Sequence, residues 1–351
     1  MLEKMRFLSV INEPVEGFQV GIRGALRKKV DMGVIEDVEF FSFLIEEKKL
    51  GNWKRVLDKL SIVIKDFQPT IILFSHTGKR FFPEEFFSRI MENNSCQPVL
   101  AYDERDVYGY IRKPLPRESM QLARKMDVIF LVAAGEFADR FRKLGCEKVI
   151  FLPHVGNIIQ FGSSWIPSRK REFDIVLIAN YHPSKIPFMS MPGVEERRKL
   201  ATVFSKEFGD RFAVFGKGWE WCQANRGPIP YEKQENILRK SWLSIGLDHF
   251  YNYEFYFSDR LPIALLSEVA HLTKRNKGLE NLFVDNRHCV FFESIEEALQ
   301  KAHVLLGKPR EELLMIGRNG AEWARKCFTE DKRMELMIEQ MKIIYFEKNK
   351  K

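Results

Sequence analysis

Two short segments in the second half of the chain carry residues suited to holding a phosphate group. Phe215-Gly-Lys-Gly-Trp219 and Ser258-Asp-Arg-Leu261 each lie beside an apolar run typical of a buried strand. Glycine lets backbone amides approach an anion closely, and a Lys or Arg side chain adds the positive charge that an amide lacks. The candidate phosphate-site residues are therefore Lys217, Gly218 and Arg260, and Asp259 beside them is a further candidate ligand-binding residue.

Two side chains in the first half are candidates for proton transfer. Asp103 follows the apolar run Val99 to Tyr102, and His76 follows the run Ile71 to Phe74. A side chain at the end of a parallel strand is well placed to remove a proton from a substrate hydroxyl. Asp103 is the first candidate base and His76 the second, and an ion pair between Asp103 and Arg105 is the structural alternative.

The elements that must position these residues recur in a regular order. Short apolar runs typical of buried parallel strands alternate with segments of helical spacing. In the first half the predicted strands are 7–11, 38–43, 71–74, 99–102, 128–133 and 149–152, with helices at 53–66, 83–93 and 136–144. This alternation predicts a doubly wound α/β domain, in which ligands bind at the carboxyl ends of the strands.

The second half repeats the pattern after a polar break at residues 162–171. Its predicted strands are 174–179, 211–215, 243–248, 270–273 and 289–292, with helices at 194–208, 233–241, 261–269, 309–328 and 330–346. We therefore expect a first domain at 1–165, a second domain at 172–328 and a C-terminal helix at 329–351 that returns to the first domain. That helix carries Met334, Met337 and Met341 at core spacing, so it needs a partner surface.

Composition narrows the class of protein. The 351 residues are 45% hydrophobic and 30% charged, which is typical of a folded protein. No apolar run approaches the roughly 20 residues that span a bilayer, and we expect a cytoplasmic protein. The five cysteines are far apart, so neither a zinc site nor a disulfide framework is indicated. The net charge of +8 favours anionic partners, and contact with nucleic acid or a membrane surface is left open.

The order of several motifs resembles that of the GT-B glycosyltransferases, and within them the CgeB-like, group 1 type. The resemblance spans about residues 125–330 and rests on Val149-Ile-Phe-Leu-Pro-His154, Phe173-Asp-Ile-Val176, Glu196-Arg-Arg198, Phe215-Gly-Lys-Gly-Trp219, Pro230-Tyr231, Ser258-Asp-Arg-Leu261 and Gly278-Leu-Glu280. It implies two facing Rossmann-like domains, with a nucleotide-sugar donor bound in the second. The residues that it implies for this donor are Arg197, Arg198 and Arg260 at phosphate, Ile229 and Tyr231 at the base, and Gly278 and Leu279 as amide donors.

One position departs from the pattern of similar families. They usually carry a Glu three residues after the Arg, where its carboxylate accepts hydrogen bonds from the ribose, whereas this chain has Ile263. Glu268 and Glu280 are the nearby carboxylates that could take over this contact.

These observations favour a glycosyltransferase that moves a sugar from a nucleotide diphosphate to an acceptor hydroxyl. A glycan, a lipid-linked glycan, a protein or a small molecule could carry that hydroxyl. The chemistry requires no cofactor, and no Asp-x-Asp motif indicates a metal site. The alternatives are a protein that binds sugar nucleotides without turnover and a DNA-modifying glucosyltransferase, for which binding would depend steeply on salt.

Overall fold

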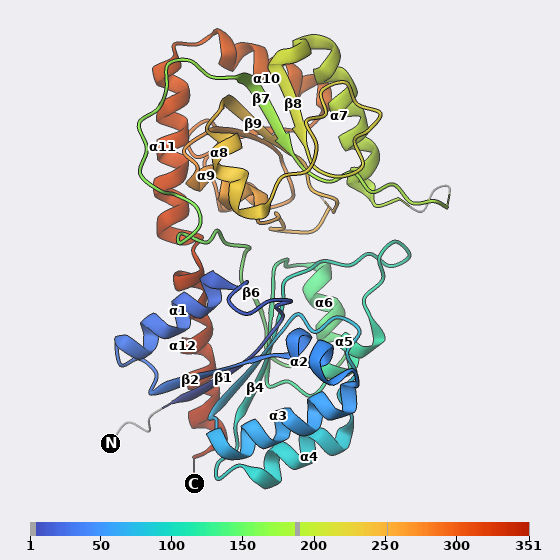
Figure 1. The fold of residues 1–351 in the computed structure, drawn as a ribbon, viewed down its shortest axis with the longest axis vertical. Coiled ribbons are helices and arrows are strands. Elements are labelled where there is room, and N and C mark those ends of the chain that lie inside the picture. The colour runs from blue at the N-terminus through green and yellow to red at the C-terminus, as the bar shows by residue number, and fades with distance from the viewer. Residues whose placement is uncertain (1–4, 187–189, 251, 351) are drawn as a thin grey trace. The chain divides into compact units, whose positions relative to one another are not determined.

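Two parallel β-sheets organise the chain (Figure 1). The structure is a computed structural model that describes residues 5–186, 190–250 and 252–350. The chain divides into two compact units, each with its own sheet. Unit 1 comprises residues 1–108, 114–152 and 330–351, and unit 2 comprises residues 109–113 and 153–329. The predicted α/β class with two parallel sheets is confirmed.

Unit 1 is built on a six-stranded sheet in the order β2-β1-β3-β4-β5-β6. Its strands are β1 (Arg6–Ile11), β2 (Asp37–Ser42), β3 (Ile71–Ser75), β4 (Val99–Glu104), β5 (Val128–Leu131) and β6 (Val149–Phe151). All neighbouring strands are parallel, and β3, β4 and β5 are buried along their whole length. Burial on both faces explains why these runs are continuously apolar rather than alternating.

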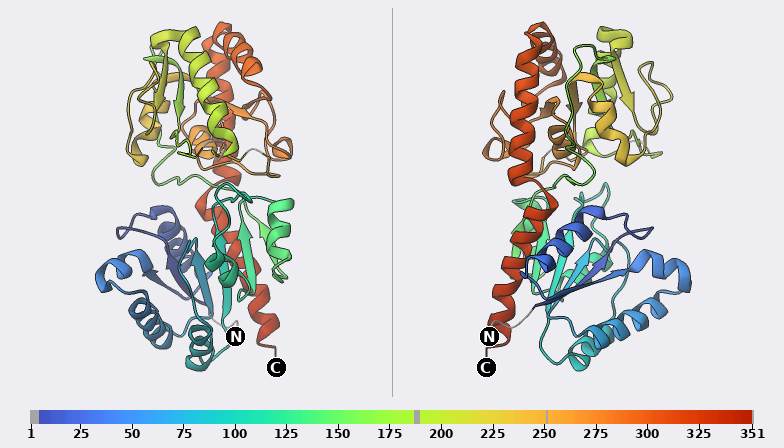
Figure 2. Two further views of the ribbon diagram at one scale, coloured as in Figure 1. Left: turned by 90° about the vertical axis from the view of Figure 1, so that its right-hand side faces the viewer. Right: turned by 60° about the vertical axis from the view of Figure 1, so that its left-hand side comes forward.

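Helices cover the faces of this sheet. They are α1 (Val20–Asp31), α2 (Phe43–Leu50), α3 (Trp53–Phe67), α4 (Glu84–Asn93), α5 (Arg117–Ala123), α6 (Glu136–Arg142) and α12 (Glu330–Lys348). The last helix lies beside α1 and β4, far from both in sequence (Figure 2). Its Met334, Met337 and Met341 are fully buried in the core that also contains Phe7 and Leu26. The apolar side chains of α12 thus have their partner surface in unit 1.

Unit 2 is built on a five-stranded parallel sheet in the order β11-β10-β9-β7-β8. Its strands are β7 (Phe173–Ile178), β8 (Phe212–Phe215), β9 (Ser241–Gly246), β10 (Ala270–Lys274) and β11 (Val290–Phe292). Around it lie α7 (Pro192–Phe208), η1 (Gly209–Arg211), η2 (Tyr231–Lys233), α8 (Gln234–Leu238), α9 (Arg260–Leu266), η3 (Leu279–Asn281), α10 (Ile295–Gly307) and α11 (Arg310–Cys327). Consecutive residues of β7, such as Ile175 and Val176, enter separate cores on the two faces of the sheet.

Several segments differ from the sequence prediction. Helices α1, α2, α5 and α10 were not expected from the sequence, and the helix expected at 233–241 is a 3-10 turn followed by the short α8. Residues 153–165, which were expected to close the first domain, group with unit 2. Val155 and Phe161 are buried there against Leu266 and neighbouring residues of α9, so this stretch contributes to the second core.

Candidate functional site

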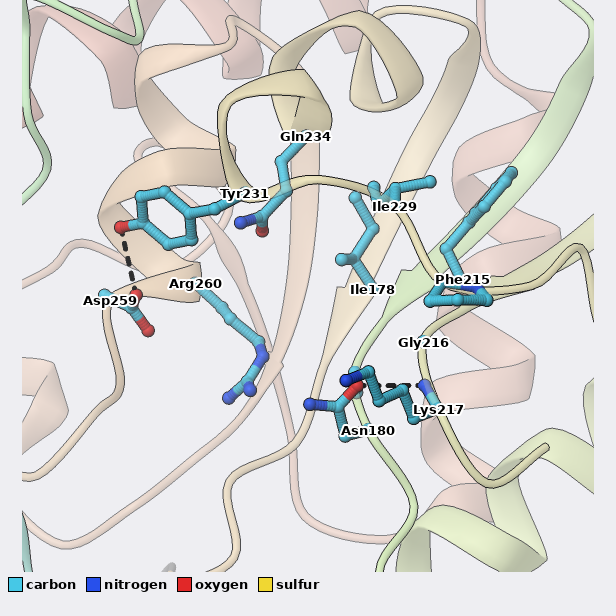
Figure 3. Close-up of a pocket in the computed structure, with 12 residues that line it drawn as sticks. Ile178, Asn180, Phe215, Gly216, Lys217, Ile229, Tyr231, Gln234, Asp259 and Arg260 are labelled. Atoms are coloured by element: carbon cyan, nitrogen blue, oxygen red, sulfur yellow. Dashed lines mark hydrogen bonds between the residues drawn. The ribbon is translucent and has the colours of Figure 1, made fainter. Parts of the chain in front are cut away.

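A pocket of about 250 Å³ lies at the carboxyl ends of β7 and β8 in unit 2 (Figure 3). Five of the residues singled out from the sequence line it, namely Lys217, Ile229, Tyr231, Asp259 and Arg260. The remaining lining residues are Ile178, Ala179, Asn180, Phe215, Gly216, Pro228 and Gln234. The two phosphate-type motifs, about 40 residues apart in the sequence, therefore converge on one pocket.

The Gly-Lys-Gly turn is shaped by close backbone contact with the end of β7. Gly216 has a φ of 150° and Gly218 a φ of 84°. A Cβ at Gly216 would lie 2.1 Å from the carbonyl oxygen of Ala179, and one at Gly218 would lie 2.0 Å from that of Tyr181. Both glycines are thus required by conformation and by space. Gly218 shapes the turn without lining the pocket.

Asn180 fixes the same turn, and the sequence analysis did not single it out. Its side-chain oxygen accepts a hydrogen bond of 2.9 Å from the backbone N–H of Lys217. The Tyr181 N–H donates to the carbonyl oxygen of Lys217, also at 2.9 Å. These bonds hold Lys217 at the pocket, where its side chain is exposed. Asn180 directly follows the predicted strand 174–179, and this position is the sequence feature from which it could have been identified.

The charged groups of the pocket do not neutralise one another. Within the part of the chain that the structure describes, Lys217, Asp259 and Arg260 form no ion pair. The Arg260 guanidinium donates one hydrogen bond of 3.3 Å, to the Ser258 hydroxyl. Asp259 accepts a hydrogen bond of 3.1 Å from the Tyr231 hydroxyl. The adjacent Asp259 and Arg260 thus form no salt bridge with each other in the described part of the chain.

Arg197 is buried and forms hydrogen bonds with the backbone beside the pocket. Its guanidinium donates to the Leu247 carbonyl oxygen at 2.8 and 2.6 Å and to that of Asn180 at 3.0 Å. Burial and the neighbouring Arg260 lower the pKa of Arg197 to about 9. Because its hydrogen bonds go to backbone carbonyls, this geometry favours a positioning role over the phosphate contact expected from the sequence.

His249 completes the buried cluster under Arg197. Its Nε2 lies 2.7 Å from Arg197 Nη1, so this nitrogen accepts the hydrogen bond and the proton is assigned to Nδ1. Burial, together with Arg197 and Arg260, lowers the pKa of His249 to about 2, which keeps the ring neutral. Burial also raises the pKa of the nearby Asp248, against the effect of both arginines and of the Ser258 N–H. The His249 ring therefore adds no positive charge beside Arg260 at neutral pH.

The other predicted donor residues do not line this pocket. Arg198 is exposed, with its guanidinium 5.9 Å from the centre of the Trp221 ring. Leu279 is fully buried in the core of unit 2, and a Cβ at Gly278 would lie 2.4 Å from the Phe255 ring. Glu280 is exposed and lines a separate pocket of about 480 Å³. Packing explains Gly278 and Leu279 without a ligand.

Asp103 in unit 1 is fully buried within a network of ion pairs. One carboxylate oxygen accepts a hydrogen bond of 2.6 Å from Arg105 Nε, and the other accepts one from Arg333 of α12. Burial alone would raise the pKa of Asp103, but the two arginines lower it to about 2. A carboxylate with both oxygens engaged and so low a pKa is poorly suited to accept a substrate proton. The geometry favours a structural role for Asp103.

His76, the second candidate base, is held in a strained conformation at the end of β3. Its φ of 37° lies in the left-handed region, which is rare for a residue with a side chain. The Asn12 side-chain amide donates to the carbonyl oxygen of His76 at 2.5 Å. The ring is one-third exposed, and its Nδ1 lies 2.5 Å from Oε1 of Glu104. Strain of this kind is often retained where a side chain must point in one direction.

Glu104 orients the His76 ring from a fully buried position. Its other oxygen accepts hydrogen bonds from the Tyr102 hydroxyl at 2.5 Å and the Tyr108 hydroxyl at 3.4 Å. Burial and the Glu104 charge raise the pKa of both tyrosines, so they stay protonated donors. With Glu104 accepting from Nδ1, the basic nitrogen of His76 is Nε2. This histidine–carboxylate pair can accept a proton from a substrate.

Among the described residues, no helix is both long and apolar enough to cross a membrane. In residues 5–186, 190–250 and 252–350, no three His, Cys, Asp or Glu side chains form a group that could hold a metal ion.

Comparison with known proteins places this geometry in a family context. Residues 196–339 match the model of a family described as glycosyl transferase-like, and this segment contains every residue of the pocket from Phe215 onward. Comparison with curated protein sequences gives no match. The family match supports the glycosyltransferase interpretation over the two alternatives raised by the sequence. The CgeB-like subtype stays a prediction.

Solved structures agree over nearly the whole chain. HepE from Anabaena, solved in complex with UDP and glucose, matches with a TM-score of 0.60 and 11% identity, over 96% of this chain and 99% of its own. Sucrose-phosphate synthase from Thermosynechococcus elongatus matches with a TM-score of 0.60 and 10% identity, over 98% and 99%. A glycosyltransferase from Rickettsia africae matches with a TM-score of 0.59 and 12% identity, over 99% and 100%. The chain therefore has the fold of the GT-B glycosyltransferases, and most of the glycosyl transferase-like segment lies in its second unit.

Proposed function

We propose that this chain transfers a sugar from a nucleotide diphosphate sugar to an acceptor hydroxyl, and that the pocket of unit 2 binds the nucleotide part of the donor. The observation that carries this proposal is the set of charged side chains at the pocket, Lys217, Asp259 and Arg260, which form no ion pair within the described residues. Charges left unpaired beside a concave surface are suited to a charged, hydroxyl-bearing ligand.

The two parts of the pocket suit the two parts of a nucleotide. Figure 3 shows Arg260, Lys217 and Asn180 along one side, with Ile178 and Ile229 farther along the wall. Two cations can hold a diphosphate through charge-assisted hydrogen bonds. The apolar side chains can contact the flat face of a base. We assign Lys217 and Arg260 to the diphosphate and Ile229 to the base.

The same residues would stabilise the transition state. As the sugar leaves the donor, negative charge builds up on the diphosphate, and fixed cations lower the barrier because they require no reorganisation at that moment. Arg197 interacts electrostatically with Arg260, and its hydrogen bonds to the Asn180 and Leu247 carbonyl oxygens hold the backbone that follows β7 and β9. In this mechanism, side chains of the protein stabilise the charge on the diphosphate, and a metal ion has no role.

For the acceptor, we propose His76 as the general base and Glu104 as its positioning residue. A base must hold its accepting nitrogen toward the hydroxyl, and the contact of Nδ1 with Glu104 directs Nε2 to that task. Glu104 also stabilises the imidazolium that forms after proton transfer. This assignment replaces Asp103, whose carboxylate is occupied by two arginines. A base of this kind implies inversion at the anomeric carbon.

Calorimetric titration of the full chain with UDP, GDP and ADP tests the donor site, because a nucleotide site binds at least one of them. Incubation with the corresponding sugar nucleotide then separates enzyme from binding protein. Release of free nucleoside diphosphate during turnover supports a transferase. Failure of all three nucleotides to bind would overturn the proposed donor site, and binding without turnover of any tested donor would favour the non-catalytic alternative.

We also propose a cytoplasmic location. Cys146, Cys222 and Cys289 are buried free thiols. Free buried thiols are typical of a reducing compartment. Oxidised, disulfide-linked protein isolated from its native cells would contradict this location.

A further inference from the structure

The pocket of unit 2 has a single carboxylate among its lining residues, that of Asp259. The other polar side chains there are Lys217, Arg260, Asn180, Gln234 and Tyr231. A carboxylate beside two cations that bind phosphate would repel the phosphate unless it served another group of the same ligand. The ligand must therefore offer hydrogen-bond donors near its phosphates, and hydroxyl groups are the donors that a nucleotide carries there.

Asp259 is not used by the fold in the usual ways. It occupies the N-cap position of α9, yet its side chain makes no capping hydrogen bond. It is adjacent to Arg260 in the sequence, yet among the described residues the two form no ion pair. Within the described residues its side chain accepts one hydrogen bond, from the Tyr231 hydroxyl to Oδ2. This contact fixes the carboxylate and leaves Oδ1 able to accept from a ligand.

The Tyr231 side chain is itself held, so the carboxylate has a defined direction. Its ring packs edge-on against Phe161, with ring centres 5.4 Å apart, and Phe161 is fully buried. Figure 3 shows Tyr231 and Asp259 together at one side of the pocket, with Arg260 between them and Lys217. A group next to the phosphate-binding cations is within reach of the ribose, because the ribose is bonded directly to the first phosphate.

Among the described residues, no other carboxylate lines this pocket. Position 263, where similar families carry a Glu, holds Ile263, which is 1% exposed and packed in the core of unit 2. Glu280 lines a different pocket, and Glu268 forms an ion pair of 2.8 Å with Arg325. Both substitutes considered from the sequence are therefore engaged or placed elsewhere.

We propose that Asp259, positioned by Tyr231, accepts hydrogen bonds from the ribose hydroxyls of the donor, so that the site selects ribonucleoside over 2′-deoxyribonucleoside diphosphates. This inference rests on the proposed function of the pocket and narrows its substrate class. A site that binds a hydroxyl through a charged acceptor discriminates strongly against the analogue that lacks it, because the acceptor is then left unpaired. Thymidine diphosphate sugars, which lack the 2′-hydroxyl, are excluded as good donors.

The test is a calorimetric titration of the full chain and of Asp259→Asn with the tightest of UDP, GDP and ADP, its 2′-deoxy and 3′-deoxy analogues, and inorganic pyrophosphate. For the native protein we expect the 2′-deoxy analogue to bind about 10- to 150-fold more weakly, the range for a hydrogen bond to a charged group. Asp259→Asn should lose a similar factor for the ribonucleotide and should no longer distinguish it from the deoxy form. Pyrophosphate has no ribose and should bind the variant as well as it binds the native protein, or more tightly.

Glu232→Gln is the matched control, because Glu232 is exposed, follows Tyr231 directly and does not line the pocket. It should keep full discrimination. Equal binding of ribonucleotide and both deoxy analogues by the native protein would overturn the inference while leaving the proposed function standing, and so would discrimination that persists in Asp259→Asn. Selection for the 3′-hydroxyl alone would overturn the exclusion of thymidine nucleotides. Absence of any nucleotide binding to the native protein would overturn the proposed function itself.

Discussion

The position of Gly216 against Ala179 determines the shape of the candidate donor site. A Cβ on Gly216 would lie 2.1 Å from the Ala179 carbonyl oxygen, a distance at which one backbone segment must move. The Ala179 N–H meanwhile donates to the Phe215 carbonyl oxygen at 2.9 Å, so the two segments are held together. The turn that presents Lys217 therefore depends on the absence of a side chain.

Gly216→Ala should damage both stability and binding. The φ of 150° is unfavourable for alanine, and strain of this kind costs about 1 to 3 kcal/mol before the clash is added. We expect the free energy of unfolding in urea to fall by at least that amount and UDP affinity to fall with it. Gly307→Ala is the control, because no heavy atom would lie within 4 Å of its Cβ. An unchanged Gly216→Ala protein would show that the turn can shift without cost.

Arg260→Ala should weaken nucleoside diphosphate binding by about 1.5 to 3 kcal/mol, the range for a hydrogen bond to a charged group, and leave the melting temperature of the free protein nearly unchanged. Arg260 is half-buried and makes one weak hydrogen bond, so little stability depends on it. Calorimetry and thermal melting measure the two quantities. Arg198→Ala, which removes an exposed arginine outside the pocket, should bind normally. An equal loss in both variants would extend the phosphate site to Arg198.

The strands were predictable because their chemistry is local. Continuous β-branched and aromatic runs such as 71–74 and 99–102 have few alternatives to a buried parallel strand. Helix α10 was missed although a signal was present, since Ser294 accepts a hydrogen bond of 3.1 Å from the Glu297 N–H as an N-cap. Helix α1 has a weaker helical signal in its sequence, because its Val20–Asp31 segment contains two glycines and no acidic residue in its first turn.

The site was partly predictable, for a related reason. Lys217 and Arg260 were found from glycines and cations beside strands, which are patterns within a few residues. Arg197 and Arg198 could not be separated, because only the packing of α7 decides which guanidinium is buried. Asp103 was misleading in the same way. Its partner Arg333 lies 230 positions away in the sequence, so the residues around Asp103 do not indicate this ion pair.

His76→Asn and Glu104→Gln should reduce turnover while leaving donor affinity intact. Removing a positioned base lowers the rate by about 10² to 10⁴-fold. Glu104→Gln keeps the shape but weakens the orientation of His76, so we expect a smaller loss and a changed pH profile of kcat. Steady-state kinetics with the donor identified by calorimetry measure kcat and its dependence on pH. Full activity of His76→Asn would point instead to a retaining mechanism, in which the donor phosphate accepts the proton.

Asp103→Asn should act on stability rather than on chemistry. Breaking a buried ion pair by removing one partner costs about 3 to 5 kcal/mol, because Arg333, which is 2% exposed, keeps an uncompensated charge. We expect this loss in urea unfolding at pH 7, with the specific activity of the folded fraction kept within a few-fold. A folded, stable Asp103→Asn protein with turnover reduced 10²-fold or more would restore Asp103 as the base.

The effect of Asp103→Asn on the free energy of unfolding should also depend on pH. The folded-state pKa of Asp103, about 2, lies below the ordinary aspartate value near 4. The stabilisation that the ionised Asp103 gives to the folded state is therefore fully present above pH 4, and it is lost as the pH falls toward 2. The difference in unfolding free energy between the native protein and Asp103→Asn should shrink by about 2.5 kcal/mol over that interval, since each pKa unit is worth 1.36 kcal/mol. Urea titrations at pH 2 to 7 measure it, and a difference independent of pH would show that Asp103 is not held ionised by Arg105 and Arg333.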